Sequence, residues 1–255
     1  MRLNFPSALI LLAPALLLAA CKGRAPEDAA GAPPAGPSVN YWSAIAPLVS
    51  GTYGGKCLRP PNAAPFKVDI VIAPDGKVGA GALGADLRKA DIALASAVDN
   101  GKPIASMNAV LGDFTIMLAD KGAAQGLVSM VASGDQAVAC EHDMAAPALR
   151  GLKVSALVAR FVDTTSRKVS CIPTGALKNE QVDYRLAGGV LTLNGETFDL
   201  NASKQETVLF TDGLSRLFYT SSLPDGRLIK INLDAQGKLA GLEGKGAGDQ
   251  LYACH

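Results

Sequence analysis

The sequence predicts an all-β protein of two tandem homologous domains, each a β-barrel or β-sandwich-like fold with a short N-terminal helix and one disulfide. The first observation is the cysteine spacing. Cys57 and Cys140 are 83 positions apart, Cys171 and Cys254 are also 83 positions apart, and the second pair follows the first by 114 positions. The second observation is a series of short apolar stretches separated by turn sequences about every ten residues, which is typical of an antiparallel meander.

The internal repeat extends beyond the cysteines. Gly134-Asp135-Gln136 recurs 114 positions later as Gly248-Asp249-Gln250, and with a slip of one residue Asp86-Leu87 matches Asp199-Leu200. Two units are too few for a solenoid, so each copy should be a globular domain of about 100 residues. The predicted divisions are 1–20 as a signal peptide, 21–40 as a lipidated N-terminus and tether, 41–145 as copy 1 and 146–255 as copy 2.

Turn sequences set the limits of the expected strands. Asn194-Gly195 favours a type I′ hairpin, and Pro74-Asp75-Gly76 and Pro224-Asp225-Gly226 mark further turns. The Ala-rich segment 85–98 fits a helix or a strand, and its match to the β-rich segment 207–210 favours a strand. The other expected strands are 67–73, 115–118, 182–186, 190–193, 217–220, 228–233 and 250–254.

A short helix is expected at the start of each copy. Trp42, Ile45 and Val49 share one helical face. The equivalent place in copy 2 is 156–162, with 147–152 as its upstream extension and the connection between the copies.

The N-terminus has the features of an export signal. Arg2 precedes an apolar stretch, 5–20, which is interrupted by two prolines and is shorter than a membrane-spanning helix. It ends in Leu18-Ala19-Ala20-Cys21, which resembles the lipobox of bacterial lipoproteins. That resemblance implies acylation of Cys21, as with palmitate, and no spanning helix in the mature chain. Lys22, in place of the aspartate that retains such proteins at the inner membrane, implies the outer membrane, with the protein facing the periplasm or the cell surface.

Residues 22–40 are expected to form a disordered tether. They are rich in Ala, Gly and Pro and have no hydrophobic period. Such a segment buries too little apolar surface to offset the entropy of ordering it. Its prolines favour extended geometry, which would hold the domains away from the membrane.

The remaining four cysteines are expected to form disulfides in an exported chain. Four cysteines allow three pairings. The duplication favours Cys57–Cys140 and Cys171–Cys254, because an ancestral single domain had both of its cysteines in one copy. No Cys-x-x-Cys occurs, and the Cys140/His142 and Cys254/His255 spacings differ, so we expect no metal site and no cofactor.

Composition narrows the function classes. Lys and Arg total 24 against 23 Asp and Glu, without a basic stripe, so nucleic acid is not an expected partner. Only two histidines occur and no nucleophile elbow is present, so no catalytic residue is predicted. The repeated polar residues Asp135, Gln136, Asp249 and Gln250 fit either a ligand-contacting rim or turn chemistry, and turn chemistry is favoured.

The expected function is a non-enzymatic binding or adaptor role in the cell envelope. The membrane is the predicted partner through Cys21, together with an unidentified envelope ligand or protein. One alternative is inhibition of a secreted enzyme, because Ser50-Gly51-Thr52-Tyr53 is similar to the Ser-Gly-x-x-Tyr pattern of lipoproteins that inhibit lysozyme. It is one residue short, and copy 2 has Thr164-Thr165-Ser166-Arg167 instead. The other alternative is an envelope hydrolase that uses His142.

Overall fold

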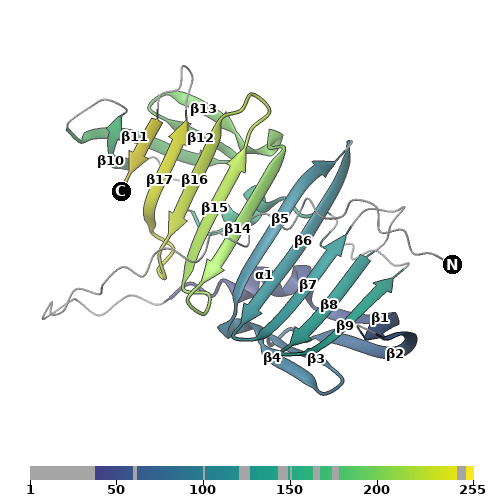
Figure 1. The fold of residues 1–255 in the computed structure, drawn as a ribbon. Helices are drawn as coiled ribbons and strands as arrows, with labels where there is room; N and C mark the ends of the chain where they lie inside the picture. Colours follow the sequence, from purple (N-terminus) through teal and green to yellow (C-terminus); the bar gives the residue numbers. More distant parts are fainter. Residues whose placement is uncertain are drawn as a thin grey trace, which may run out of the picture. The chain divides into compact units, whose positions relative to one another are not determined.

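Antiparallel β-structure dominates the chain, so the all-β prediction is confirmed (Figure 1). The computed structural model describes residues 38–59, 62–99, 101–120, 127–142, 149, 151–162, 167–173, 178–245 and 251–255. The signal peptide, Cys21 and the tether up to residue 37 lie outside these residues, as do Asp249 and Gln250. Among the described residues, no helix is long and apolar enough to cross a membrane.

Copy 1 forms one continuous sheet. Its ladders place the strands in the order β4-β3-β2-β1-β9-β8-β7-β6-β5. The helix α1 precedes the first strand. The bounds are α1 Trp42–Val49, β1 Gly51–Arg59, β2 Asn62–Ile72, β3 Lys77–Ala80, β4 Leu83–Asp86, β5 Asp91–Asp99, β6 Lys102–Leu111, β7 Phe114–Asp120, β8 Leu127–Ser133 and β9 Gln136–His142.

Copy 2 repeats this order. Its ladders run β13-β12-β11-β10-β18-β17-β16-β15-β14, which is the order of copy 1 strand for strand. Neither copy is divided into two separate sheets. The bounds are α3 Val154–Val158, β10 Arg167–Pro173, β11 Glu180–Ala187, β12 Val190–Leu193, β13 Glu196–Asp199, β14 Gln205–Thr211, β15 Arg216–Ser222, β16 Leu228–Leu233, β17 Leu239–Lys245 and β18 Leu251–Cys254.

The two copies meet through equivalent strands. β5 pairs antiparallel with β14, and the two strands lie side by side in Figure 1. The buried positions of the two strands align at the 114-residue offset, which makes Leu94 equivalent to Val208. These two residues face each other, so the ladder is symmetric about a local two-fold axis. Equivalent surfaces therefore contact each other as in an isologous dimer. Gly36–His255 form one compact unit, and the division into two domains stays a prediction.

Local sequence explains several of the turns. Asn194 and Gly195 have φ values of 52° and 79°, and Leu193 faces Glu196, so the predicted two-residue hairpin is confirmed. The matching Asp86 and Asp199 each accept a backbone N–H two residues ahead and begin a short 3₁₀ turn, Leu87–Lys89 and Leu200–Ala202. In the ambiguous segment 85–98, the favoured strand is confirmed as β5, which follows the first of these turns.

The first predicted helix is confirmed as α1, whereas the second is shorter and shifted. α3 covers Val154–Val158 in place of 156–162, and Arg160 to Val162 continue as turns. The backbone N–H groups of Val154 and Ser155 donate to the Glu206 carboxylate, both at 3.1 Å, which sets where α3 begins. Of the expected upstream extension, only residues 149, 151 and 152 are described, and they are not part of α3.

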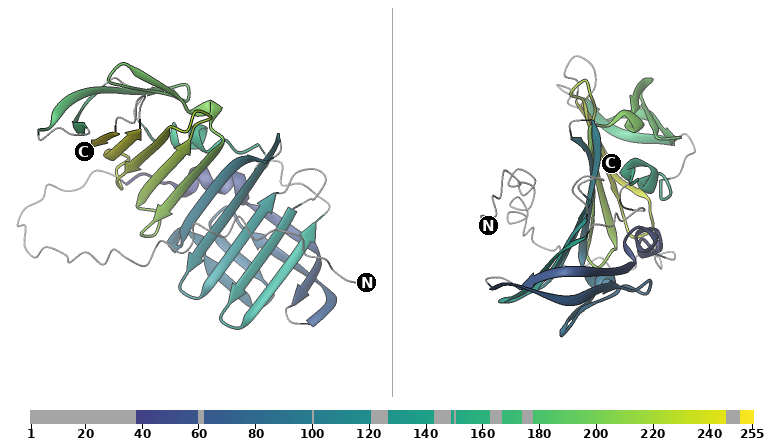
Figure 2. Two further views of the ribbon diagram at one scale, coloured as in Figure 1. Left: turned by 45° about the horizontal axis from the view of Figure 1, so that its top comes forward. Right: turned by 90° about the vertical axis from the view of Figure 1, so that its right-hand side faces the viewer.

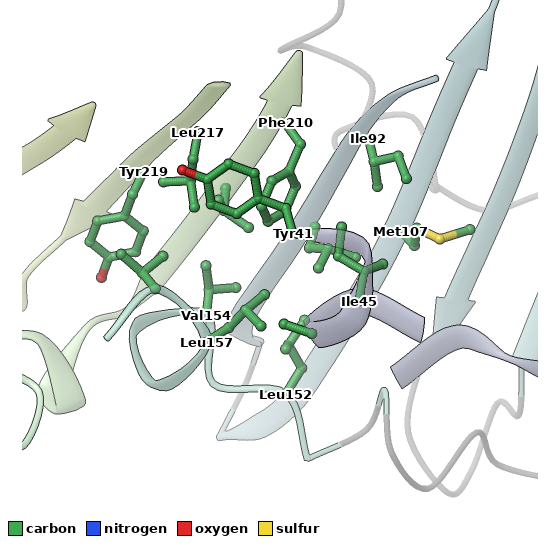
Figure 3. Close-up of a cluster of buried hydrophobic side chains, with 14 of the residues drawn as sticks. Tyr41, Ile45, Ile92, Met107, Leu152, Val154, Leu157, Phe210, Leu217 and Tyr219 are labelled. Carbon is green, nitrogen blue, oxygen red and sulfur yellow. The ribbon is translucent and has the colours of Figure 1, made fainter. Parts of the chain in front are cut away.

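Both helices pack on one face of the sheet (Figure 2). Figure 3 shows Tyr41 beside Phe210 of copy 2, and Ile45 of α1 beside Val154 and Leu157. The Tyr41 ring centre is 4.7 Å from that of Phe161 and 5.5 Å from that of Phe210. The start of copy 1 therefore contributes to the core of copy 2, and burying each such side chain stabilises the fold by about 1.5–3 kcal/mol.

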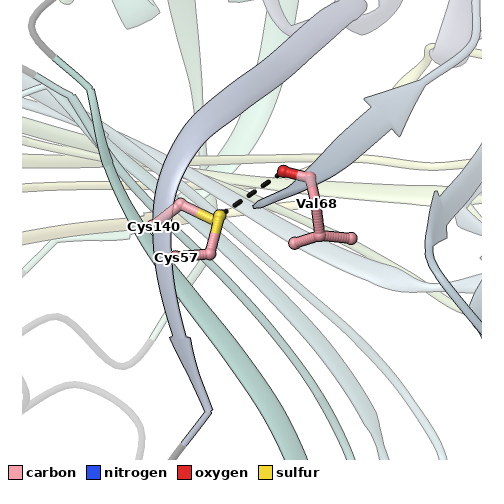
Figure 4. The surroundings of a disulfide bond; sticks show 3 residues. All are labelled: Cys57, Val68 and Cys140. Carbon is pink, nitrogen blue, oxygen red and sulfur yellow. Dashed lines mark hydrogen bonds between the residues drawn. A yellow bond between two sulfur atoms is a disulfide. The ribbon is translucent and has the colours of Figure 1, made fainter. Parts of the chain in front are cut away.

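Both predicted disulfides are confirmed. Cys57–Cys140 joins β1 to β9, and Cys171–Cys254 joins β10 to β18, with Cα atoms 4.0 and 3.9 Å apart. Figure 4 shows the first bond beside the Val68 carbonyl oxygen, 3.4 Å from the Cys57 sulfur. A disulfide sulfur carries no proton, so this approach is a contact and not a hydrogen bond.

Candidate functional site

A pocket of about 340 Å³ opens in copy 2, next to the residues that follow α3. Its lining includes the buried side chains of Val162, Tyr184 and Leu233. Exposed Arg160 and Lys238 also line it. The lining thus combines buried apolar side chains with two exposed cationic ones.

The fold accounts for the placement of each lining residue. β11 alternates exposed and buried positions, which directs Tyr184 inward. Leu233 ends β16, and Lys238 lies in the turn that leads to β17. The Asp234 side chain accepts the backbone N–H groups of Gln236 and Lys238, both at 2.9 Å, and so fixes the turn.

The first described residues of the chain close one side of this region. The Val39 N–H donates to the Ala235 carbonyl at 2.8 Å, and the Tyr41 hydroxyl donates to the Asp234 carbonyl at 2.8 Å. Gly237 has φ 71°, and a Cβ atom there would lie 2.9 Å from Val39 Cγ2, so glycine permits this approach. The N-terminal segment and the β16–β17 turn therefore hold each other in place.

Burial and then the Asp234 charge raise the pKa of Tyr41 to about 12. Its hydroxyl therefore keeps its proton at neutral pH and remains a donor. The ring of Tyr41 also meets Phe161 edge to face, which supports one wall of the pocket.

The two cations of the pocket are available to a ligand. Neither Arg160 nor Lys238 forms an ion pair with any residue in the described ranges. Elsewhere in copy 2, Lys230 pairs with Glu243 at 2.8 Å, and Arg227 pairs with Asp225 at 2.7 Å. The lining of the pocket therefore carries positive charge beside apolar side chains. That chemistry suits an amphipathic anion, whose carboxylate or phosphate would accept charge-assisted hydrogen bonds.

Of the sequence-predicted polar residues, the described pair in copy 1 does not line this pocket. Asp135 and Gln136 are exposed at the β8–β9 turn of copy 1, where Gly134 has φ 57°. That geometry fits the favoured turn interpretation, while the ligand-rim alternative stays a prediction. Cys21, Asp249 and Gln250 lie outside the described residues.

The two histidines and the Ser-Gly pattern lie in strands or at their ends. His142 ends β9, and the backbone N–H of exposed His255 donates to the Ser170 carbonyl at 3.0 Å. Tyr53 is buried in β1, where its hydroxyl donates to the Val49 carbonyl at 2.6 Å. Burial raises the pKa of Tyr53 to about 12, so this residue acts as a neutral core donor.

Sequence reasoning missed Arg160, Tyr184 and Lys238. Divergence between the copies was the available signal, because at the 114-residue offset Arg160 corresponds to Ala46 and Lys238 to Ala124. Comparison with known protein families, characterised proteins and solved structures finds no match.

Proposed function

We propose that this chain is a lipid-anchored cell-envelope protein that binds a small amphipathic anion without transforming it. The observation that carries the proposal is the copy 2 pocket, where Arg160 and Lys238, which have no ion-pair partner among the described residues, line the pocket together with apolar side chains. A fatty-acid-like carboxylate or a monoalkyl phosphate has the matching chemistry. Its head would meet the two cations, and its chain would contact Val162 and Leu233.

The anchor belongs to the same proposal. Acylation of Cys21 would hold the chain at the outer membrane, and the tether would give the pocket reach toward envelope ligands. Several acyl chains on one cysteine bind a bilayer firmly, because each buried CH₂ contributes about 0.8 kcal/mol. We also propose that the two copies are homologous domains, each closed by its own disulfide.

Replacing Cys21 with serine should abolish lipid attachment. Cells fed labelled palmitate should label the wild-type chain and leave Cys21→Ser unlabelled, since the serine hydroxyl is not the acceptor. Lys22→Asp is the matched control. It should keep the label and move the protein from the outer-membrane to the inner-membrane fraction. Label retained by Cys21→Ser would show that the anchor is elsewhere.

Removing the pocket cations should weaken anion binding at least tenfold. The double variant Arg160→Gln/Lys238→Gln loses two charge-assisted bonds, and such a bond contributes about 1.5–3 kcal/mol. Titration calorimetry with octanoate, with octanol as the uncharged probe, measures the difference. Octanoate should bind the wild type, and octanol should bind more weakly.

Arg185→Gln is the matched control for the pocket, because Arg185 is exposed and adjoins Tyr184 on the same strand, pointing to the opposite face. It should bind octanoate like the wild type. Equal affinity of the double variant and the wild type would contradict the assignment of the pocket, as would equal affinity for octanol and octanoate.

The geometry does not favour inhibition of an enzyme through Ser50-Gly51-Thr52-Tyr53. The tyrosine of this segment is buried and its hydroxyl is already bonded within copy 1. A residue held in this way has no group to present to an enzyme's active site. Binding of a small ligand is therefore the function we propose.

A further inference from the structure

The second surface of interest is the sheet face opposite the core, across strands β15, β14 and β5 to β9. Along these strands alternate residues point to the core, such as Met107 and Ile116, which are fully buried. Their neighbours Asn108 and Met117 point the opposite way. The ladders align such outward residues in one row across the sheet, namely Phe218, Leu209, Ala93, Asn108, Met117 and Met130. We call this surface the uncharged face.

Charged residues are confined to the borders of the uncharged face. Asp91, Lys102, Asp113 and Glu141 lie at strand ends or in the turns. Between them the outward residues of β5 to β8 are Ala, Ser, Thr, Asn, Val, Ile and Met. Large apolar side chains are open to solvent here, since Val110 is 42% and Phe218 36% exposed. An apolar surface with a polar border is the usual anatomy of a protein interface.

The dimensions of the uncharged face match those of a stable interface. Seven adjacent strands spaced about 4.8 Å apart, with about seven residues each, span roughly 34 Å by 24 Å. This gives about 800 Å², the area that each partner contributes to a standard protein–protein interface.

We infer that the uncharged face is a homodimer interface, in which two copies of this chain pack sheet against sheet. A second copy offers a face of the same area, equally free of charge, and outward Ser, Thr and Asn side chains can bond across it. A charged partner would lose hydration without gaining an ion pair. The border carries the acidic residues Asp91, Asp113 and Glu141 as well as the basic residues Lys102 and Arg216, so it has no cationic excess to attract an anionic lipid surface. Paired sheets of this kind pack about 10 Å apart with their strands roughly aligned.

The test is the mass of the full-length protein in density-matched detergent, measured by sedimentation velocity. The wild type should sediment with twice the mass of the chain. Asn108→Asp places a charge at the centre of the face with almost no change in size, so it should halve the mass. Met117→Lys should do the same. Gln181→Glu makes the same kind of change at an exposed position of β11, outside the face, and should remain dimeric.

Folding must be preserved for the comparison to count. The melting temperatures of Asn108→Asp and Met117→Lys should lie within a few degrees of that of the wild-type monomer. If one variant melts much lower, it is set aside and the other variant decides the test. A monomeric wild type would overturn the inference, whether or not that monomer binds phosphatidylcholine vesicles. Dimers that persist in both variants would also overturn it. None of these outcomes depends on the pocket, because octanoate binding is measured separately.

Discussion

Replacing both cysteines of either disulfide with alanine should lower the free energy of unfolding by about 4 kcal/mol, the largest loss we expect. Each bond closes a loop of the same sequence separation, 83 residues. In the chain-entropy description, a loop of this length restricts the unfolded chain by roughly 4–5 kcal/mol. Urea unfolding of Cys57→Ala/Cys140→Ala and of Cys171→Ala/Cys254→Ala measures the loss for each copy.

Because the two loops have the same length, the two double variants should lose similar free energies of unfolding, within about 1 kcal/mol of each other. The reduced wild type should lose more than either variant. If one double variant unfolded at the wild-type urea concentration, its bond would not restrain the unfolded chain as proposed. Full stability in both would contradict the entropic argument for this fold.

Glu206→Gln should destabilise the protein by about 3 kcal/mol. Glu206 is 3% exposed, and each of its two carboxylate oxygens accepts two hydrogen bonds. Tyr219 and the Ser155 N–H donate to Oε1 at 2.8 and 3.1 Å, while the Val154 N–H and Ser96 donate to Oε2 at 3.1 and 3.2 Å. Glutamine would place an NH₂ group where one carboxylate oxygen now accepts hydrogen bonds. This NH₂ group would face N–H or O–H donors that lose their acceptor, and unsatisfied buried groups cost about 1–3 kcal/mol each.

This carboxylate links three parts of the structure. It receives Ser96 from β5, Tyr219 from β15 and the first turn of α3, so its loss should loosen the junction between the copies. Burial and then the Glu206 charge raise the pKa of Tyr219 well above its ordinary range, which keeps the hydroxyl a donor. The expected loss should therefore appear at neutral pH.

Glu243→Gln is the control for Glu206→Gln. Glu243 pairs with Lys230 on the surface, with both side chains about half exposed, and such pairs contribute at most about 1 kcal/mol. Thermal unfolding of both variants, followed by near-UV circular dichroism, separates the two effects. A Glu206→Gln protein as stable as Glu243→Gln would show that the buried network contributes little.

Local sequence predicted the elements well where a residue has one strong conformational preference. Asn194-Gly195 forms the expected hairpin because both residues tolerate positive φ. Asp86 and Asp199, which the sequence matched between the copies, begin equivalent turns that were not predicted, because a short carboxylate can accept a nearby backbone N–H. The limits of α3 were not predictable in this way, because the Glu206 carboxylate that fixes its start lies 52 residues from Val154 in the sequence.

The candidate pocket was beyond sequence analysis for the same reason. Arg160, Tyr184 and Lys238 come from a post-helix turn, a strand and a distant hairpin, and each alone has an ordinary surface or core pattern. They form a candidate site only because the fold brings them together. The repeated Asp135-Gln136 attracted notice as a recurring motif, and in copy 1 this pair lies at the β8–β9 turn and does not line the pocket.

The sequence alone determined the β class and the pairing of its cysteines, because periodicity, turn residues and spacing are properties of the chain itself. Tertiary structure decided how the copies join, which residues line the pocket and which side chains of the sheet point away from the core. Those features depend on contacts between residues far apart in the chain. The β5–β14 ladder joins residues more than a hundred positions apart, and nothing in either strand specifies its partner.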